Sequence, residues 1–203
     1  MGSVIAVANQ KGGVGKTTTT INLAASIAKR GYKVLIVDID PQGNATSGLG
    51  IEKSTIEYDI YNVLIDEIPI ASAIKPTSSK KLDILPATIN LAGAETELIS
   101  MMARETRLKG AIEDLGDKYD FAFIDCPPSL GQLSINAFTA SQSILIPVQS
   151  EYYAMEGLSQ LLNTIRLVQK HFNKDLGVEG VLLTMLDARP NLGADVVQQV
   201  KEY

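Results

Sequence analysis

Short runs of apolar residues, rich in valine and isoleucine, alternate along the chain with longer stretches in which apolar and polar positions mix. The runs are Val4–Ala8, Val34–Val37, Leu82–Leu85, Phe121–Ile124, Ser143–Val148 and Val181–Met185. Strands that are buried on both faces of a sheet have continuous apolar sequences of this kind, because neither face meets water. The pattern predicts an α/β fold with a mostly parallel twisted sheet and helices on both faces.

Helices are predicted where apolar side chains recur with a period of about 3.6 residues. One such stripe follows the first run and a longer one follows the fifth, with members Ile21, Ala24, Ala25 and Ala28, and Leu158, Leu161, Leu162, Ile165 and Val168. Each stripe is typical of a helix that packs against a sheet. Gly48–Pro76 shows neither period, so we expect loops and short helices there. Gly193–Tyr203 has the pattern of a helix without a C-cap glycine.

A glycine-rich segment, NQKGGVGKTTTT at Asn9–Thr20, lies between the first predicted strand and the first predicted helix. The usual phosphate-binding loop has a glycine, any four residues, and then Gly-Lys-Ser/Thr. Residues 15–17 fit that pattern, but Gln10 stands at the first glycine position and an additional lysine, Lys11, follows it. Backbone N–H groups of such a turn, and the start of the following helix, converge on an anion. The segment therefore predicts a triphosphate site of the P-loop NTPase type.

The side chains of this loop have distinct expected roles toward a nucleotide. Lys16 is expected to reach the β and γ phosphates, and the Thr17 hydroxyl is expected to bind Mg²⁺. Thr18 is expected to donate to the α phosphate, although a threonine in a first helical turn also fits a capping role. The residues expected to bind the nucleotide are Lys11, Gly12, Gly13, Val14, Gly15, Lys16, Thr17 and Thr18.

Three aspartates stand at the ends of predicted strands. Asp38 and Asp40 end the second run, in VLIVDIDPQGN, and Asp125 ends the fourth, in FAFIDCPPS. Ligands of open α/β sheets bind at the carboxyl ends of the strands, so these acids are expected to face the loop. We expect Asp38 and Asp125 to hold Mg²⁺ together with Thr17, and Asp40 to position the attacking water.

Other polar residues favour ordinary structural roles. Cys126 is the single cysteine, which excludes an internal disulfide and a cysteine-only zinc site, and a small buried thiol is expected. His171, the single histidine, ends an amphipathic stretch and is expected at the surface, where no Ser/His/Asp arrangement can form around it. Thr46 and Ser47 are weaker candidates for positioning water and are more typical of a turn.

Composition narrows the class of protein further. The length of 203 residues suits a single domain over residues 1–203. A net charge of −5 argues against a surface coated for nucleic acid, and the lack of tryptophan argues against a base-stacking platform. Any DNA contact is therefore expected to be a local patch. No apolar run has the length of a membrane span and the N-terminus has no signal-peptide pattern, so we expect a cytoplasmic location and no membrane partner.

Three motifs, KGGVGKTT, DIDPQGNATSGLG and IDCPPSLG, resemble those of the deviant Walker A ATPases, and within them the ParA/Soj chromosome and plasmid partition ATPases. PVQSEYYAMEGLSQL and LLTMLDAR are similar to the same family, so the resemblance runs from about Val4 to the end. It implies ATP and Mg²⁺ as cofactors. It also implies a slow, partner-stimulated, Mg²⁺-dependent hydrolysis of ATP, with Lys11, Lys16 and Asp40 as catalytic residues.

The resemblance also implies a role for the additional lysine. In the family this lysine reaches across an ATP-bound homodimer to the partner's phosphates, so Lys11 is expected to act in trans. Two facing nucleotides bring many negative charges together, and a cation from each subunit offsets them. Gly12 is then expected to be small so that the two loops can approach closely.

For the whole protein, the family implies a switch that drives chromosome or plasmid segregation. The ATP-bound homodimer would bind double-stranded DNA nonspecifically at the nucleoid, and a ParB-like partner would release it by stimulating hydrolysis. DNA affinity would come from phosphates neutralised by lysine and arginine. Arg189, in LDAR, resembles a DNA-contacting position of the family, and a solvated loop arginine before Pro190 is an equal alternative.

The chain also departs from the family pattern, and two other functions stay open. Family members continue beyond this point with a strand, an adenine-recognising loop and a terminal helix, so we expect the C-terminal part to be missing after Tyr203. A MinD-like positioning ATPase would need a lysine-rich amphipathic C-terminal helix, which the sequence lacks. A P-loop metabolic ligase would need a carboxylate or amine substrate. The single cysteine excludes an iron–sulfur reductase of this fold.

Overall fold

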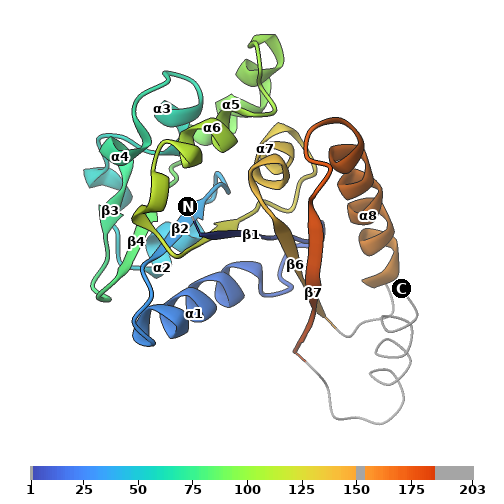
Figure 1. The fold of residues 1–203 in the computed structure, drawn as a ribbon, viewed down its shortest axis with the longest axis horizontal. Helices are drawn as coiled ribbons and strands as arrows, with labels where there is room; N and C mark the ends of the chain where they lie inside the picture. The colour runs from blue at the N-terminus through green and yellow to red at the C-terminus, as the bar shows by residue number, and fades with distance from the viewer. Residues whose placement is uncertain (1, 150–153, 186–203) are drawn as a thin grey trace.

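A mixed β-sheet forms the centre of the molecule in the computed structural model, which describes residues 2–149 and 154–185. The strand order is β3-β4-β2-β5-β1-β6-β7, and every neighbouring pair is parallel except β3 with β4 (Figure 1). The strands are β1 (Ser3–Val7), β2 (Val34–Asp38), β3 (Lys75–Pro76), β4 (Leu82–Leu85), β5 (Phe121–Asp125), β6 (Ser143–Gln149) and β7 (Gly177–Thr184).

Helices cover both faces of this sheet, but unequally. In Figure 1, α1 lies along one face, and α5, α6, α7 and α8 lie on the opposite side. The α-helices are α1 (Lys16–Lys29), α2 (Asn44–Gly48), α3 (Ile60–Leu64), α4 (Ile70–Ala73), α5 (Leu91–Glu97), α6 (Arg107–Glu113), α7 (Gln132–Ala140) and α8 (Ala154–His171). Short 3₁₀ turns are η1 (Lys53–Thr55), η2 (Leu98–Ser100) and η3 (Gly116–Lys118).

The strands read as continuous apolar runs because successive side chains enter two different cores. In β2, Leu35 and Val37 join the core beneath α5 to α8, whereas Val34 and Ile36 join the core beneath α1. All of them are fully buried. The α/β fold with a mostly parallel sheet, predicted from the sequence, is therefore confirmed.

Most predicted elements are present, with differences at the sheet edges. The two apolar stripes lie on α1 and α8, and Gly48–Pro76 contains only turns, short helices and β3. Strand β7 begins at Gly177 rather than at Val181, and a bulge interrupts its pairing with β6. Its first half contains Glu179 and Gly180 and is therefore not a continuous apolar run. The two-residue β3 was not predicted, and its proline suits an edge strand. The helix expected at Gly193–Tyr203 lies outside the described residues.

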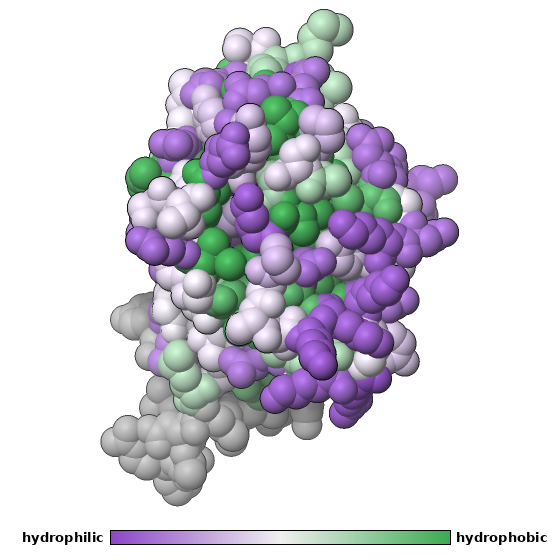
Figure 2. Space-filling view, turned by 90° about the vertical axis from the view of Figure 1, so that its left-hand side faces the viewer, coloured by the Kyte–Doolittle hydropathy of each residue, from purple (hydrophilic) through white to green (hydrophobic). Residues whose placement is uncertain are grey.

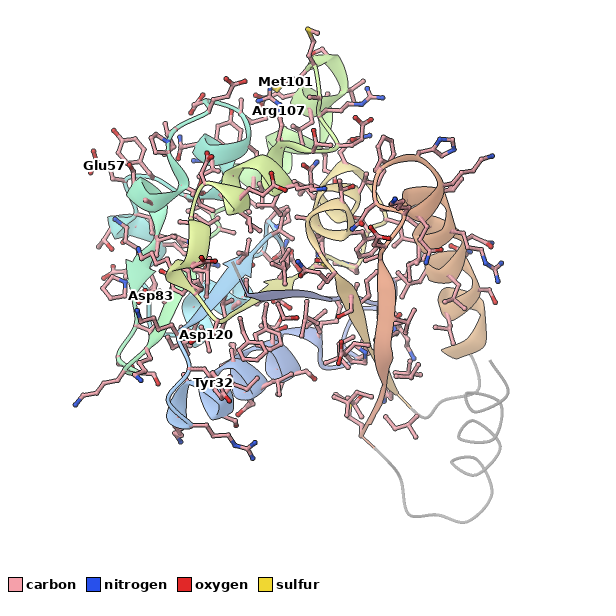
Figure 3. All side chains as sticks on the ribbon, viewed as in Figure 1. Tyr32, Glu57, Asp83, Met101, Arg107 and Asp120 are labelled. Carbon is pink, nitrogen blue, oxygen red and sulfur yellow. The ribbon has the colours of Figure 1, made fainter. Side chains whose placement is uncertain are left out.

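The end of the sheet where the strands begin is held by structural contacts. Asp120 Oδ2 accepts a hydrogen bond from the Lys33 N–H at 2.7 Å, and Asp83 Oδ2 accepts one from the Tyr119 hydroxyl at 2.8 Å. The Tyr32 ring meets the Phe121 ring edge to face, with centroids 5.4 Å apart. Figure 3 shows Tyr32, Asp83 and Asp120 at this end of the molecule.

The surface that carries β3, α3 and α4 is largely polar. Figure 2 shows apolar groups on this face as patches interrupted by polar side chains. Exposed large apolar residues come from separate segments, as is usual for folded domains, and include Tyr58, Ile89 and Met102. Within residues 2–149 and 154–185, no helix combines the length and the apolar character needed to cross a membrane.

Candidate nucleotide-binding site

The glycine-rich loop joins the end of β1 to the start of α1. Gly13 and Gly15 have φ angles of 76° and 87°, in the left-handed region that favours glycine, and Gly15 is the N-cap of α1. The first turn of α1 contains no acidic side chain, so the positive end of the helix dipole is not offset locally. This local geometry is suited to an anion at the helix N-terminus.

Lys16 is the buried cation of the loop. Its side chain is 7% exposed, and Nζ donates a hydrogen bond to the Lys11 carbonyl oxygen at 3.1 Å. Burial lowers the pKa of Lys16, while the nearby Asp125 carboxylate opposes that change by favouring the charged form. A buried ammonium group beside a helix N-terminus is a suitable partner for a phosphate group.

Asp125 lies fully buried at the end of β5 and is bonded to α1. Its Oδ2 accepts from the Thr17 hydroxyl at 2.7 Å, and its Oδ1 accepts from the Thr20 hydroxyl at 3.2 Å. Burial raises the pKa of Asp125 to about 7, despite the hydrogen bond from Thr17, and the Asp38 carboxylate raises it further. Ionisation of such a carboxylate is favoured by a cation, and the Thr17 oxygen beside it is the predicted Mg²⁺ ligand.

Asp38 is the register partner of Asp125 on the neighbouring strand β2, and it is also fully buried. Its Oδ2 accepts from the Thr46 N–H at 2.8 Å and from the Thr46 hydroxyl at 2.7 Å. Burial raises the pKa of Asp38 to about 6, although the bonds from Thr46 oppose the change. The Thr46 oxygen in turn accepts from the Ala87 N–H at 2.9 Å.

The interpretation of Thr46 as an ordinary turn residue is therefore wrong, because Thr46 is fully buried and connects Asp38 to the chain beyond β4. Thr46 follows Asp38 by eight positions with no regular pattern between them, so this contact could not be predicted from local spacing. Ser47 lies in α2, and its hydroxyl makes a local bond to the Gly43 carbonyl oxygen four residues earlier, at 3.2 Å.

Asp40 lies two residues beyond Asp38, at the same sheet edge, and is 8% exposed. Its Oδ1 accepts from the Gln42 N–H at 2.9 Å, and its carbonyl oxygen accepts from the Gly43 N–H at 2.8 Å. These bonds form a turn led by an aspartate, which fixes the side chain at the carboxyl edge of β2. An aspartate in this turn is also compatible with the predicted role of Asp40, which is to position the attacking water.

Three polar residues near the loop were not singled out by the sequence. Thr20 shares the Asp125 carboxylate with Thr17. Asn9, at the end of the first apolar run, donates through Nδ2 to the Pro147 carbonyl oxygen at 2.7 Å and accepts from the Lys11 N–H at 3.0 Å. Thr184 donates to the Val14 carbonyl oxygen at 2.8 Å. Thr20 follows Thr17 by about one helical turn, and this spacing could have predicted that both face the same carboxylate. No local pattern points to the contact of Thr184 with the loop.

The glycine-rich loop and the three predicted aspartates meet at one edge of the sheet. Of the other predicted positions, Thr18 is exposed on α1. A Cβ added to Gly12 would meet no described atom within 4 Å, so packing within the chain does not require a glycine there. Arg189 lies outside the described residues. Within residues 2–149 and 154–185, no cluster of three or more His, Cys, Asp or Glu could hold a metal.

Cys126 and His171 have the structural roles that were expected. Burial raises the pKa of the Cys126 thiol, and a thiol with a raised pKa is unreactive. His171 lies exposed at the end of α8.

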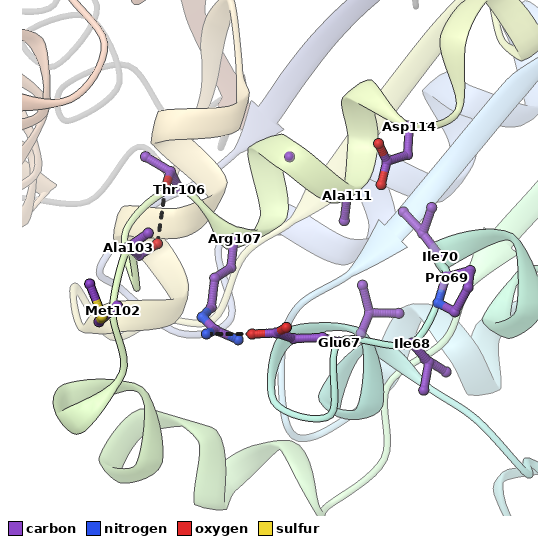
Figure 4. A pocket seen from close by; sticks show the side chains of 12 residues that line it. Glu67, Ile68, Pro69, Ile70, Met102, Ala103, Thr106, Arg107, Ala111 and Asp114 are labelled. Carbon is purple, nitrogen blue, oxygen red and sulfur yellow. Dashed lines mark hydrogen bonds and ion pairs between the residues drawn. The ribbon is translucent and has the colours of Figure 1, made fainter.

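A pocket of about 540 Å³ lies between α6 and the segment joining α3 to α4, and none of its lining residues belongs to the glycine-rich loop. Figure 4 shows the ion pair across it, in which Arg107 Nη2 lies 2.8 Å from Glu67 Oε1. Arg107 Nη1 also donates to the Leu64 carbonyl oxygen at 2.8 Å, at the last residue of α3. Arg107 thus caps the C-terminus of α3. The pocket is separate from the nucleotide site.

A parallel sheet with a glycine-rich loop between β1 and α1, and aspartates at the ends of adjacent strands, defines a P-loop NTPase. The profile of the AAA domain family matches residues 2–178. The sporulation initiation inhibitor protein Soj of Bacillus subtilis is 63% identical over 100% of this chain and 80% of its own length. The chromosome partitioning protein ParA of Myxococcus xanthus is 53% identical over 100% of this chain and 72% of its own length. The chain belongs to the Soj/ParA family of chromosome-partitioning P-loop ATPases.

Solved structures share the fold of this chain. A structure described as cobyrinic acid a,c-diamide synthase from Mycobacterium smegmatis, with bound ADP and magnesium, has a TM-score of 0.95 and 41% identity, covering 100% of this chain and 82% of its own. A plasmid partition protein from Borrelia burgdorferi has a TM-score of 0.86 and 26% identity, covering 100% of this chain and 86% of its own.

Proposed function

We propose that this protein is an Mg²⁺-dependent ATPase that acts as a switch in chromosome or plasmid segregation. The observation that carries the proposal is the deviant loop, with its two lysines, opposite the buried aspartates of β2 and β5. Relatives named for chromosome partitioning at 53% and 45% identity support the segregation role. The related structure that holds ADP and magnesium supports the two cofactors, ATP and Mg²⁺.

The loop residues 11–18 bind the triphosphate in this proposal. Lys16 contacts the β and γ phosphates, and its buried charge is offset when they bind. Thr17 contributes a hydroxyl oxygen to Mg²⁺, and Asp125 holds that hydroxyl at 2.7 Å. Asp38, raised in pKa by burial, adds negative charge near the cation. Bound Mg²⁺ supplies charge stabilisation for the phosphates.

Asp40 orients the attacking water in the same proposal. Asp40→Ala is expected to keep nucleotide-dependent dimerisation and to lower turnover by about 100-fold, because water would no longer be held in line with the γ phosphate. Asp114→Ala, which removes an exposed acid beside the separate pocket, is the matched control. Phosphate release by Asp40→Ala at the parent rate would remove Asp40 from the mechanism.

The homodimer is the second part of the proposal. Lys11 reaches the partner's phosphates, and the open surroundings of Gly12 leave room for a second loop. Sedimentation of the full chain with a non-hydrolysable ATP analogue and Mg²⁺ is expected to give a dimer, and sedimentation with ADP a monomer. A monomer in both conditions would contradict the dimer.

DNA and a partner protein complete the proposed cycle. The ATP-bound dimer contacts duplex DNA through a local basic patch that includes Arg189, and a ParB-like protein stimulates hydrolysis and release. The net charge of −5 restricts this contact to a small area. DNA binding is expected to weaken with salt, because the contact neutralises phosphates and reads no bases. ATPase assays with and without duplex DNA, at two salt concentrations, test this step. An ATPase rate that duplex DNA does not change at either salt concentration would contradict this step.

A metabolic ligase is the second candidate, because a structure described as a diamide synthase is 41% identical to this chain. Relatives at 53% and 45% identity carry chromosome-partitioning names, which favours the switch. Turnover that depends on a small carboxylate or amine, and that ignores DNA, would favour the ligase.

A further inference from the structure

Thr184 ends the edge strand β7, and its side chain contacts the glycine-rich loop from a distant part of the sequence. Its hydroxyl donates a hydrogen bond to the Val14 carbonyl oxygen at 2.8 Å, across 170 positions of sequence. Val14 itself is 1% exposed, so water has little access to replace this bond. A buried carbonyl oxygen that loses its partner is costly, which makes this hydroxyl a specific requirement of the folded loop.

The bond fixes the orientation of one peptide unit. The peptide between Val14 and Gly15 is trans, so its carbonyl oxygen and its N–H point in opposite directions. While Thr184 holds the Val14 oxygen toward β7, the Gly15 N–H is turned away from β7. Gly15 is the N-cap of α1, where backbone N–H groups are the donors to a bound phosphate.

The methyl group of Thr184 lies on the side of Gly15 where a side chain would be. A Cβ built on Gly15 would lie 3.6 Å from Thr184 Cγ2. Glycine has no Cβ, so the hydrogen bond to Val14 carries the contact between Thr184 and the loop. Serine retains this hydrogen bond, whereas valine and alanine lose it.

The backbone beside Thr184 is held in an unusual conformation. Met185 has a φ of 51°, in the left-handed region that non-glycine residues rarely adopt. Such a residue persists where its surroundings determine the local path of the chain. This residue directly follows Thr184, which makes the contact with the loop.

We propose that Thr184 is a positioning residue of the phosphate-binding loop. Its hydroxyl orients the Val14–Gly15 peptide, so that the Gly15 N–H is ready to donate to a phosphate oxygen, and it thereby sets nucleotide affinity. The inference rests on the proposed nucleotide binding. It differs from the roles of Lys16 and Thr17, because Thr184 acts through the backbone of the loop and does not contact the nucleotide.

Equilibrium binding of a fluorescent ADP analogue in Mg²⁺ to the full chain tests the proposal. Thr184→Val is expected to weaken binding by about 3- to 10-fold, the effect of one lost hydrogen bond. Thr184→Ser is expected to bind within about twofold of the parent, because the hydroxyl remains. Thr164→Val is the matched control, since Thr164 also donates to a backbone carbonyl oxygen, that of Gln160 at 3.1 Å, but on α8.

The outcomes separate the possible explanations. Parent-like affinity in Thr184→Val overturns the proposal, and so does a lower melting temperature without nucleotide combined with unchanged affinity, because that result describes a purely structural threonine. If Thr184→Val does not fold, Thr184→Ala and Thr184→Ser decide, and equal affinities in these two variants overturn the proposal. A parent protein that binds no nucleotide would instead refute the proposed function.

Discussion

The two ends of the sheet use the same residue type for opposite purposes. At the carboxyl end of the strands, Asp38 and Asp125 are fully buried side by side, and burial raises the pKa of each. At the other end, Asp120 is exposed and accepts a hydrogen bond from the Lys33 backbone, and Asp83 accepts one from Tyr119. The first pair is unfavourable for the empty fold, whereas the second pair stabilises it.

This difference indicates where function has shaped the molecule. Buried carboxylates without a cation lower stability, and proteins retain them where a ligand supplies the missing charge. Hydroxyl groups from Thr17, Thr20 and Thr46 hold the buried pair in place. Substitutions at the two ends should therefore separate activity from stability.

The largest expected effect is on turnover when a buried carboxylate is neutralised. Asp125→Asn is expected to lower ATP turnover by about 100-fold, because the group that holds Thr17 toward Mg²⁺ loses its charge. The melting temperature without nucleotide is expected not to fall at pH 8, because a charge that burial disfavours has been removed. Steady-state phosphate release and thermal unfolding measure the two effects.

Asp120→Asn at the opposite end is the matched control, with parent-like turnover and slightly lower stability expected. If both variants lost activity equally, or if Asp125→Asn unfolded at a lower temperature than Asp120→Asn, the contrast between the two ends would be wrong.

A second comparison sets a lysine of the loop against a lysine of the opposite end. Lys11→Ala is expected to weaken ATP-dependent dimerisation by about 30-fold or more, because the proposed dimer loses a charge that would face the partner's phosphates. Lys33→Ala, an exposed lysine next to Asp120, should leave dimerisation unchanged. Sedimentation with a non-hydrolysable ATP analogue measures both. Equal dimerisation by Lys11→Ala and by the parent would exclude the role in trans.

Sequence patterns predicted the site better than they predicted its supports. Local signals were enough to select Lys16, Asp38 and Asp125 as candidates, since each is adjacent to a glycine-rich turn or ends an apolar run. The supporting contacts of Thr46 and Thr184 were missed because only the folded chain creates them, across 41 positions to Ala87 and 170 positions to Val14.

The fold followed the same rule. Strands buried on both faces, such as β2, were predicted because their apolar runs are unbroken. Strand β3 has two residues and no period, and the first half of β7 contains Glu179 and Gly180 beside a bulge. Edges of a sheet carry weak patterns because they are only partly buried.

The buried pair also predicts a pH dependence of stability without nucleotide. Folded pKa values of about 7 for Asp125 and about 6 for Asp38 exceed the unfolded value of about 3.9, so the folded state binds more protons between these values. The stabilising contribution is complete below the unfolded pKa and is lost as pH rises through 6 and 7. The free energy of unfolding should fall by up to about 1.4 kcal/mol per pH unit for each group.

Urea unfolding between pH 5 and 8 measures this slope, and Asp125→Asn is expected to reduce it. Saturating Mg²⁺ and ADP should flatten it, because a bound cation favours the ionised carboxylates. A parent protein whose stability rose from pH 5 to 8 without nucleotide would show that the acids are not disfavoured by burial.

The smallest expected effect lies at the structural end. Tyr119→Phe removes the hydroxyl that donates to Asp83 at 2.8 Å and leaves the buried ring in place. The loss should be about 1 kcal/mol in the free energy of unfolding, since one hydrogen bond disappears and the partly exposed Asp83 can turn to water. Nucleotide affinity should not change, because this contact is at the opposite end of the sheet from the loop. Urea unfolding and ADP binding on the same preparation decide the matter, and a weakened affinity would mean that the two ends are coupled through the strands.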